Sequence, residues 1–452
     1  MDTLSTLIPP LAAIAFAIVL RNVYGALLLA LFLSEAFVAG GPVGGLTASF
    51  DRVVEVFGSA YNTQILLFCL LIGAVIALAR DSGGVAATAR ALLGRGIVRT
   101  PRRAELMVAA TGTALFVETN VSLLGSGVLG RPLYDAHGLS RERLAYIIDS
   151  TSAPVSVLVP FNGWGAYAMG LVAAQGLAQP FGVVLGAVPL NFYALLTVGL
   201  VYVTALTGRV FGPMRAADAR TEAVAAPGGA APTRPRYMWV PLGVLVGGAL
   251  LFMTLTGGGS IVNGDGARSI LWAVSLAALL GALLVRRDRV MDGQAVGRAV
   301  FGGIGEMVPL VTVLLLALAL GASLNALGTG EMVARLAAGS LPPFLAPAVL
   351  FVAAGVASFS TGTSWGTYGL LIPIAMPLAA ALGVPPTLAL AAVLGGGVFG
   401  DHCSPLSDTT LIASVASGTE HLSHVTTQLP YALATGAAAL AAYLISGLVV
   451  SL

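Results

Sequence analysis

The sequence has 452 residues, of which 57% are apolar and only 9% are charged, and its formal net charge is +2. Soluble globular chains carry roughly 25% charged residues, so this composition excludes an ordinary soluble domain. The nearly balanced charge, without a basic stripe with interleaved aromatic residues, also excludes a nucleic-acid-binding protein.

Long apolar runs recur along the chain, and each is long enough to cross a hydrocarbon core of about 30 Å as a helix. The runs are continuously apolar, which favours helices over the alternating strands of a β-barrel. No basic residue precedes Arg21, so the positive segment of a cleaved signal peptide is missing and the first helix should remain. We predict membrane spans over residues 4–20, 23–40, 62–80, 143–175, 181–207, 238–256, 268–285, 301–325, 385–417 and 429–450.

The positively charged side chains are all arginines, and they are concentrated in the stretches 80–103, 131–143, 209–236 and 286–298. Because positively charged loops of membrane proteins stay in the cytoplasm, we expect these stretches inside and both termini outside. This orientation requires residues 104–131 and 342–381 each to enter and leave on one side, as re-entrant helical hairpins. The expected location is the bacterial cytoplasmic (inner) membrane, as a multi-pass protein.

The two halves of the chain contain similar motifs in the same order. Residues 77–94 align with residues 323–339, and Asp149-Ser-Thr-Ser-Ala-Pro aligns with Asp401-His-Cys-Ser-Pro. Loop 80–105 is rich in arginine, whereas its counterpart contains only Arg335. With an odd number of predicted spans in each half, the halves should therefore have opposite orientations in the membrane.

We accordingly predict an all-α polytopic membrane protein made of two inverted repeats. Each repeat should have five transmembrane helices plus a re-entrant helical hairpin, with discontinuous helices in the core. A stretch rich in Ala, Pro, Gly and Arg should form a flexible cytoplasmic linker between them. The predicted units are a first repeat over 1–208 (hairpin 104–131, broken helix 143–175), the linker over 209–236, and a second repeat over 237–452 (hairpin 342–381, broken helix 385–417).

Four polar clusters interrupt the apolar segments, and buried polar groups in a membrane are costly enough to indicate function. Two clusters lie at the predicted hairpin turns and two in the predicted broken helices. The candidate ion- or proton-binding carboxylates are Asp149, Asp401, Asp408 and Glu118. The candidate groups for coordinating a substrate or a hard cation are Thr119, Asn120, Ser150, Thr151, Ser152, Thr363, Ser364, Ser404, Ser407 and Thr409. The predicted helix-breaking residues are Pro154, Gly400 and Pro405.

These polar residues also have structural interpretations. Hydroxyls in membrane helices often bond back to the preceding turn, and Asp149 could cap the half-helix that follows it. Glu118 could be a structural carboxylate at a partly hydrated hairpin tip. Glu35 and Glu306 have no polar counterpart in the other half, so we expect both at the membrane interface.

A zinc site is one interpretation of Cys403 and three histidines, His402, His421 and His424. We expect His402 and Cys403 at the opposite end of one span from His421 and His424, which argues against zinc. His421 and His424 are then expected to be solvated at the cytoplasmic end, where they could at most sense pH. An intramembrane hydrolase is not expected, because adjacent residues on one broken helix do not form a positioned nucleophile and base.

With these motifs, the chain resembles the NhaC-type Na+/H+ antiporter family of the ion transporter superfamily. The resemblance covers roughly residues 60–205 and 300–445 and is most specific in RPLYDAHGLSRERLAYIIDSTSAPV, FSTGTSWGTYGLLIPIAMP, GVFGDHCSPLSDTTLIAS and EHLSHVTTQLPYA. It implies a transport core of two hairpins and two broken helices. It also implies ion-site roles for Asp149, Ser152, Thr363, Ser364, Asp401, Ser404, Asp408 and Thr409. The chain departs from relatives at the first hairpin, where it reads Phe116-Val-Glu-Thr-Asn.

The expected function is secondary active transport that exchanges Na+ for H+ by alternating access, with no cofactor beyond the transported ions. The Na+ ligand candidates are Asp401, Asp408, Ser404 and Thr363. The expected partners are the lipid bilayer, the two ions and a possible second copy of the chain. The alternative is Na+- or H+-coupled transport of a small organic anion, such as a malate- or lactate-like acid or an amino acid. Against it, no arginine lies in the predicted core, because Arg131 and Arg143 are expected in loops.

Overall fold

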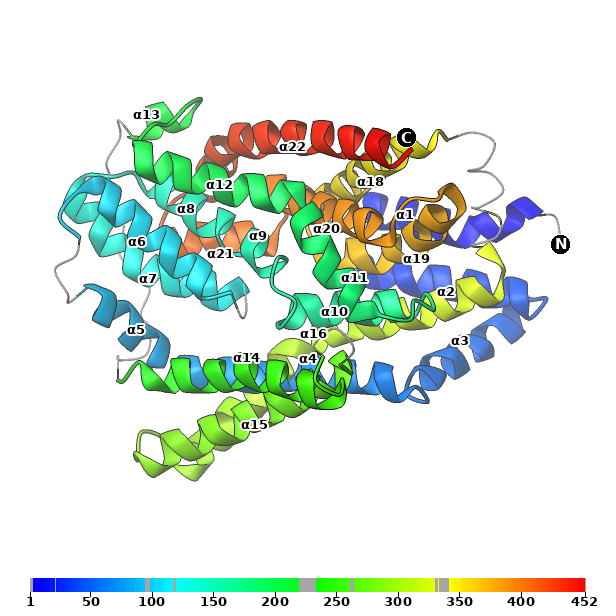
Figure 1. Cartoon of the computed structure of the whole chain (residues 1–452), viewed down its shortest axis with the longest axis horizontal. Coiled ribbons are helices and arrows are strands. Elements are labelled where there is room, and N and C mark those ends of the chain that lie inside the picture. The colour runs from blue at the N-terminus through cyan, green and yellow to red at the C-terminus, as the bar shows by residue number, and fades with distance from the viewer. Residues whose placement is uncertain are drawn as a thin grey trace.

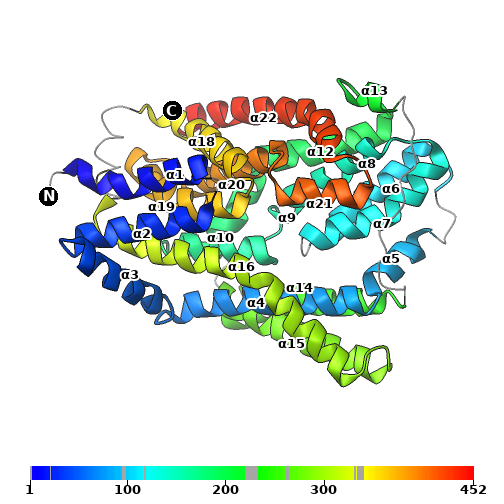
Figure 2. The same cartoon turned by 180° about the vertical axis from the view of Figure 1, so that it is seen from behind.

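The computed structural model describes residues 3–20, 22–93, 98–116, 119–218, 233–260, 264–329, 332 and 341–451. Throughout this part the regular structure is helical, which confirms the predicted all-α class. Within these described residues, seven helices are long and apolar enough to cross a membrane, or up to nine if each of two bent pairs is one span. The predicted broken helices over 143–175 and 385–417 lie between α22 (His421–Ser451) on one edge of the molecule and three helices on the other (Figures 1 and 2). These three are α4 (Ala60–Asp81), α14 (Arg236–Thr256) and α15 (Gly266–Arg287).

The N-terminal region contains a sharp bend that was not predicted. The chain bends by 118° between α2 (Val23–Val38) and α3 (Pro42–Val56). Gly40 adopts a φ of 74° at this bend, a conformation that glycine accepts without strain. The other described elements here are η1 (Thr3–Leu7), α1 (Ile8–Leu20), α4 (Ala60–Asp81) and α5 (Gly84–Leu93).

The segment predicted as the first hairpin consists of two packed helices, α6 (Pro101–Ala114) and α7 (Thr119–His137). The predicted span 143–175 is interrupted twice and forms α8 (Arg141–Ser150), α9 (Ala153–Ser156) and α10 (Gly163–Ala173). It is followed by a helix bent by 46°, because the side chain of Asn191 caps a new helix by accepting from the Ala194 amide. This bent helix comprises α11 (Pro180–Ala187), η2 (Val188–Leu190) and α12 (Phe192–Thr207).

The start of the predicted linker contacts the rest of the chain and contains a short helix. Phe211 stacks on Tyr431 with ring centroids 3.9 Å apart, and α13 (Met214–Asp218) follows it. Asp218 lies 3.1 Å from a guanidinium nitrogen of Arg143 on α8. Residues 219–232 lie outside the described residues.

The second half begins with α14 (Arg236–Thr256), α15 (Gly266–Arg287) and α16 (Gly293–Ala326). The segment predicted as the second hairpin comprises η3 (Pro343–Leu345), α18 (Ala346–Thr361) and α19 (Ser364–Leu382), joined at Gly362 with a φ of 68°. The predicted span 385–417 is interrupted between α20 (Pro386–Cys403) and α21 (Asp408–Ser417). The last helix, α22 (His421–Ser451), begins eight residues before the predicted residue 429.

The two carboxylates expected at the membrane interface occupy different environments. Glu306 is 46% exposed and lies 2.9 Å from Arg80, which agrees with an interfacial position. Glu35 is buried and paired with Arg52 at 2.7 Å. Glu35 is thus shielded from solvent, because the bend between α2 and α3 folds Arg52 back over it.

Gly400 lies inside α20 and does not break it, which corrects the prediction for this residue. A Cβ atom here would overlap the backbone oxygen of Gly355 and lie 2.6 Å from the Phe359 amide nitrogen, both on α18. Glycine is needed at this position because the two helix backbones touch. The interruption of the span instead falls at Ser404–Ser407, which includes Pro405.

Gly400→Ala is expected to destabilise the protein, because overpacking against a fixed backbone costs about 1–3 kcal/mol. The intrinsic helix propensity of alanine offsets only about 1 kcal/mol of this cost. Gly305→Ala on α16 is the matched control, since no atom lies within 4 Å of its Cβ position. Thermal unfolding of both variants in detergent measures the difference; equal melting temperatures would contradict the close contact.

Candidate ion and proton site

Asp149 lies at the end of α8, where the helix stops for local reasons. Ser152 has φ −98° and ψ −84°, outside the helical region, and Pro154 in the first turn of α9 has no amide hydrogen to donate. The Thr151 hydroxyl bonds back to Ile147 O at 2.8 Å, which is the structural interpretation considered for such hydroxyls. The carboxylate of Asp149 is 1% exposed.

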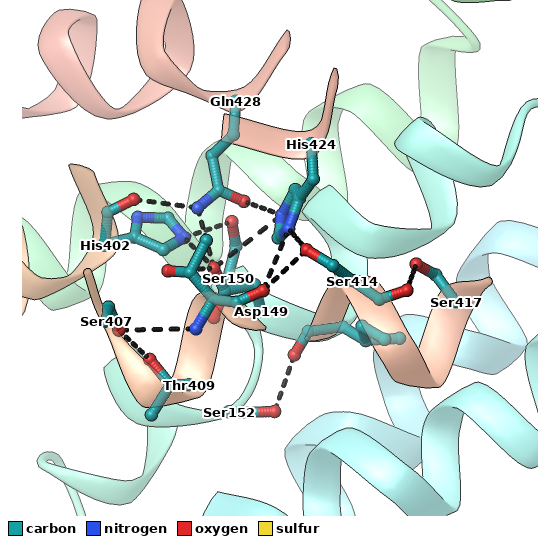
Figure 3. A network of polar contacts seen from close by, with 12 residues as sticks. Asp149, Ser150, Ser152, His402, Ser407, Thr409, Ser414, Ser417, His424 and Gln428 are labelled. Atoms are coloured by element: carbon teal, nitrogen blue, oxygen red, sulfur yellow. Dashed lines mark hydrogen bonds and ion pairs between the residues drawn. The ribbon is translucent and has the colours of Figure 1, made fainter. Parts of the chain in front are cut away.

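The partners of Asp149 come from the other half of the chain (Figure 3). Its Oδ2 atom accepts from Gln428 Nε2 at 2.7 Å and from Thr410 Oγ1 at 3.3 Å. The Nε2 atoms of His402 and His424 each lie 3.8 Å from the same oxygen. Elements α20, α21 and α22 therefore meet α8 at one buried carboxylate.

The two histidines near Asp149 correct the expected distribution of histidines. His402 and His424 are both buried and flank one carboxylate, although we expected them at opposite ends of a span. The break after α20 and the early start of α22 bring them together. His402 also contacts Ser150 Oγ at 3.0 Å and the Tyr193 hydroxyl at 2.8 Å. His421 is partly exposed, which agrees with the prediction for this residue.

Asp401 lies near the end of α20 and is 3% exposed. Its Oδ2 atom accepts from the hydroxyl of Ser364 at 2.8 Å, in the first turn of α19. Ser404 donates to Phe359 O at 2.7 Å, and Thr363 precedes α19 with a partly exposed side chain. The break in α20–α21 is therefore joined to the turn between α18 and α19.

The first half repeats this junction between a helix break and a hairpin turn. Ser152 donates to Ser122 Oγ at 2.9 Å, and Ser122 in turn donates to Gly112 O. Trp164 on α10 donates to the hydroxyl of Thr119 at 3.1 Å. Glu118 and the side chain of Asn120 lie outside the described residues.

Local hydrogen bonds order the start of α21. The hydroxyl of Ser407 accepts from the Thr410 amide at 3.3 Å and contacts the Thr409 hydroxyl at 2.9 Å. Ser407 is thus the N-cap of α21. The side chain of Asp408 lies outside the described residues. In the described part of the chain, no group of three or more His, Cys, Asp or Glu side chains is arranged to hold a metal ion.

Two arginines expected outside the core are buried at the end of α21. Arg131 on α7 donates to Ala416 O at 2.8 Å and to Val415 O. Arg141 on α8 donates to Ser417 O at 2.9 Å and pairs with Asp135 at 2.7 Å. Positive charge at a helix C-terminus complements the helix dipole and satisfies the final carbonyls. The loop placement predicted for Arg131 and Arg143 is wrong, because both lie in helices and are buried.

Buried carboxylates beside interrupted membrane helices are typical of the class of membrane transporters. Residues 163–448 match the family model described as the Na+/H+ antiporter family. The chain belongs to this family, which confirms the NhaC-type resemblance.

The chain is similar to several relatives and to a solved structure. An uncharacterised protein of Haemophilus influenzae is 30% identical over 98% of this chain and 90% of its own length. The Na+/H+ antiporter NhaC of Alkalihalophilus pseudofirmus is 39% identical over 19% of this chain and 18% of its own. The malate-2H+/Na+-lactate antiporter of Bacillus subtilis is 39% identical over 19% of each chain. The Alcanivorax borkumensis YdaH transporter has the same fold, with a TM-score of 0.67, 18% identity and coverage of 89% and 88% of the two chains.

Proposed function

We propose that this protein exchanges Na+ for H+ across the cytoplasmic membrane by alternating access. The observation that carries the proposal is the burial of Asp149 and Asp401 beside two helix breaks, with Asp149 held by side chains from the opposite half. A carboxylate in a low-dielectric site is stable when a cation balances it or when a proton neutralises it. Competition between Na+ and H+ for the buried carboxylates then couples the movements of the two ions.

We further propose that the chain consists of two inverted repeats over 1–208 and 237–452. The common order of elements supports this: α6, α7 and the broken α8–α9 in the first half, then α18, α19 and the broken α20–α21 in the second. The opposite arginine content of the equivalent loops also supports it. In this arrangement the two hairpins and two broken helices form the moving transport core.

The proposed roles of the two carboxylates differ. We assign Na+ to the Asp401 side, where the Ser364 hydroxyl donates to the carboxylate and the Ser404 hydroxyl donates to Phe359 O at the break. Thr363 and Asp408 are proposed as further Na+ ligands. Hydroxyl, carboxylate and freed carbonyl oxygens suit a hard cation. The buried group around Asp149 is assigned to the proton, because the described neighbours of this carboxylate are hydrogen donors and two imidazoles.

Exchange of an organic anion is the second candidate, supported by the similarity to the malate-2H+/Na+-lactate antiporter. The nearest buried guanidinium groups give it no support, because Arg131 and Arg141 already donate to backbone carbonyls at the end of α21.

Reconstitution into proteoliposomes containing a pH-sensitive dye separates the two functions. An inward Na+ gradient is expected to raise the internal pH in a saturable manner, whereas K+ and choline should not. Gradients of malate or lactate are tested in parallel, with and without Na+. Proton movement that requires one of these organic ions and ignores Na+ alone would replace the proposed function with the second candidate.

A further inference from the structure

The side chain of Gln428 connects Asp149 with His424 in one fixed orientation (Figure 3). Its Nε2 atom donates to Asp149 Oδ2 at 2.7 Å and to His402 O at 2.8 Å. Since a backbone carbonyl only accepts hydrogen bonds, the amide nitrogen of Gln428 must face His402 O and Asp149, and Oε1 must face His424. Oε1 lies 2.9 Å from His424 Nε2, so this ring nitrogen must carry a hydrogen.

The second ring nitrogen of His424 faces acceptors. His424 Nδ1 lies 2.9 Å from Ser414 Oγ and 3.3 Å from Thr410 O. The single hydroxyl hydrogen of Ser414 is also within reach of Thr410 O at 2.8 Å and of His421 Nδ1 at 3.1 Å. When His424 is neutral, the single hydroxyl hydrogen of Ser414 faces three acceptors: His424 Nδ1, Thr410 O and His421 Nδ1. Two of these three contacts then lack a hydrogen.

Adding one proton to His424 Nδ1 reduces this shortage from two contacts to one. Nδ1 then donates to Ser414 Oγ, and the hydroxyl hydrogen of Ser414 is free to bond to Thr410 O. The resulting imidazolium lies 3.8 Å from Asp149 Oδ2, so the buried pair carries no net charge. Both charged groups keep hydrogen-bonded partners, which a buried ion pair needs in order to be tolerated.

We infer that His424 takes up the exchanged proton as an imidazolium, with Asp149 as its counter-charge and Gln428 as the positioning residue between them. This inference rests on the proposed function and specifies its proton site. Gln428 also bonds to the carbonyl of His402, the residue after Asp401, so it connects the proton site with the break that carries the proposed Na+ site. Loss of the proton leaves Asp149 as a buried anion.

Other titratable and charged groups surround this pair. Helix α8 contributes Glu142, which accepts from Ser423 at 2.8 Å, in addition to Asp149. Helix α20 contributes His402, and α22 itself contributes His421. On α21, Thr410 and Ser414 face the ring, and the two arginines at its C-terminus bind carbonyls. Among these groups, His424 is the one that Gln428 joins to the carboxylate.

The test uses the full chain in lipid nanodiscs with 15N-labelled histidine. The protein has four histidines, so nitrogen NMR can resolve each ring, with assignment by His→Gln variants at each position. His424 is expected to pass from the doubly protonated form to the Nε2–H tautomer as the pH is raised from about 4 to about 8. Na+ should shift this equilibrium toward the neutral form, and Asp149→Asn should move the titration to lower pH, because the counter-charge is lost. A neutral His424 throughout this pH range would overturn the inference.

A transport measurement gives an independent result. His424→Gln is expected to lower Na+-driven proton flux at least tenfold and to flatten its pH dependence, while Na+ still stabilises the protein against heat. His137→Gln is the matched control, because His137 lies at the end of α7 and contacts Leu133 O. An unchanged pH profile in His424→Gln would refute the role of His424. Absence of Na+-driven flux in the unmodified protein would instead refute the proposed function and leave the NMR result to be judged separately.

Discussion

Na+-driven proton flux by the Asp401→Asn variant is expected to fall to the level of protein-free liposomes. An asparagine has the same shape and can still accept from Ser364, which lies 2.8 Å from the carboxylate. It cannot balance the charge of a cation in a buried site. Loss even of a group that only orients a metal ligand lowers metal affinity by roughly 10–100-fold, so loss of a ligand should cost at least as much. Initial rates of internal pH change against Na+ concentration provide the measurement.

Glu306→Gln is the control for this experiment. Glu306 is half-exposed and pairs with Arg80 away from both helix breaks, so the variant is expected to retain exchange. Thermal stabilisation by Na+ should disappear in Asp401→Asn and persist in Glu306→Gln. Asp401→Asn with full activity and full stabilisation by Na+ would remove Asp401 from the proposed site.

Glu105→Ala is expected to have the largest effect on stability. Glu105 on α6 is 1% exposed and lies 2.7 Å from Arg143 on α8, which is also buried. Removing one partner of a buried ion pair leaves a buried charge and typically costs about 3–5 kcal/mol. Arg143 also lies 3.1 Å from Asp218, so the variant should weaken the attachment of α13 as well. Thermal unfolding in detergent and limited proteolysis near residue 218 measure the two effects.

A double variant tests the cause of this loss. Glu105→Leu with Arg143→Met removes both charges and fills the space with apolar groups, a replacement that is often neutral or stabilising. The double variant is therefore expected to be more stable than Glu105→Ala. Asp81→Asn is the control, since Asp81 is exposed and its pair with Arg80 contributes at most about 1 kcal/mol. A double variant less stable than Glu105→Ala would show that this ion pair has a role beyond compensating its own burial.

Several features of this protein can be predicted from the order of its residues. Runs of apolar residues predict membrane helices, because their length must match the hydrocarbon thickness. Pro154 and Pro405 predict interruptions near Asp149 and Asp401, because proline cannot donate a backbone hydrogen bond. These are local rules, so they apply without knowledge of distant neighbours.

The meeting of Asp149 with His424 and Gln428 could not be predicted in this way. Asp149 and Gln428 are 279 residues apart, and no local pattern distinguishes a histidine that faces water from one that faces a carboxylate on another helix. Gly400 illustrates the same limit, since a glycine in an apolar run is compatible with a helix break and with close backbone contact. The packing of α20 against α18 shows that Gly400 permits close backbone contact and does not break the helix. The proton site is therefore a property of how α8, α21 and α22 pack, since its hydrogen bonds exist only when these three helices are in contact.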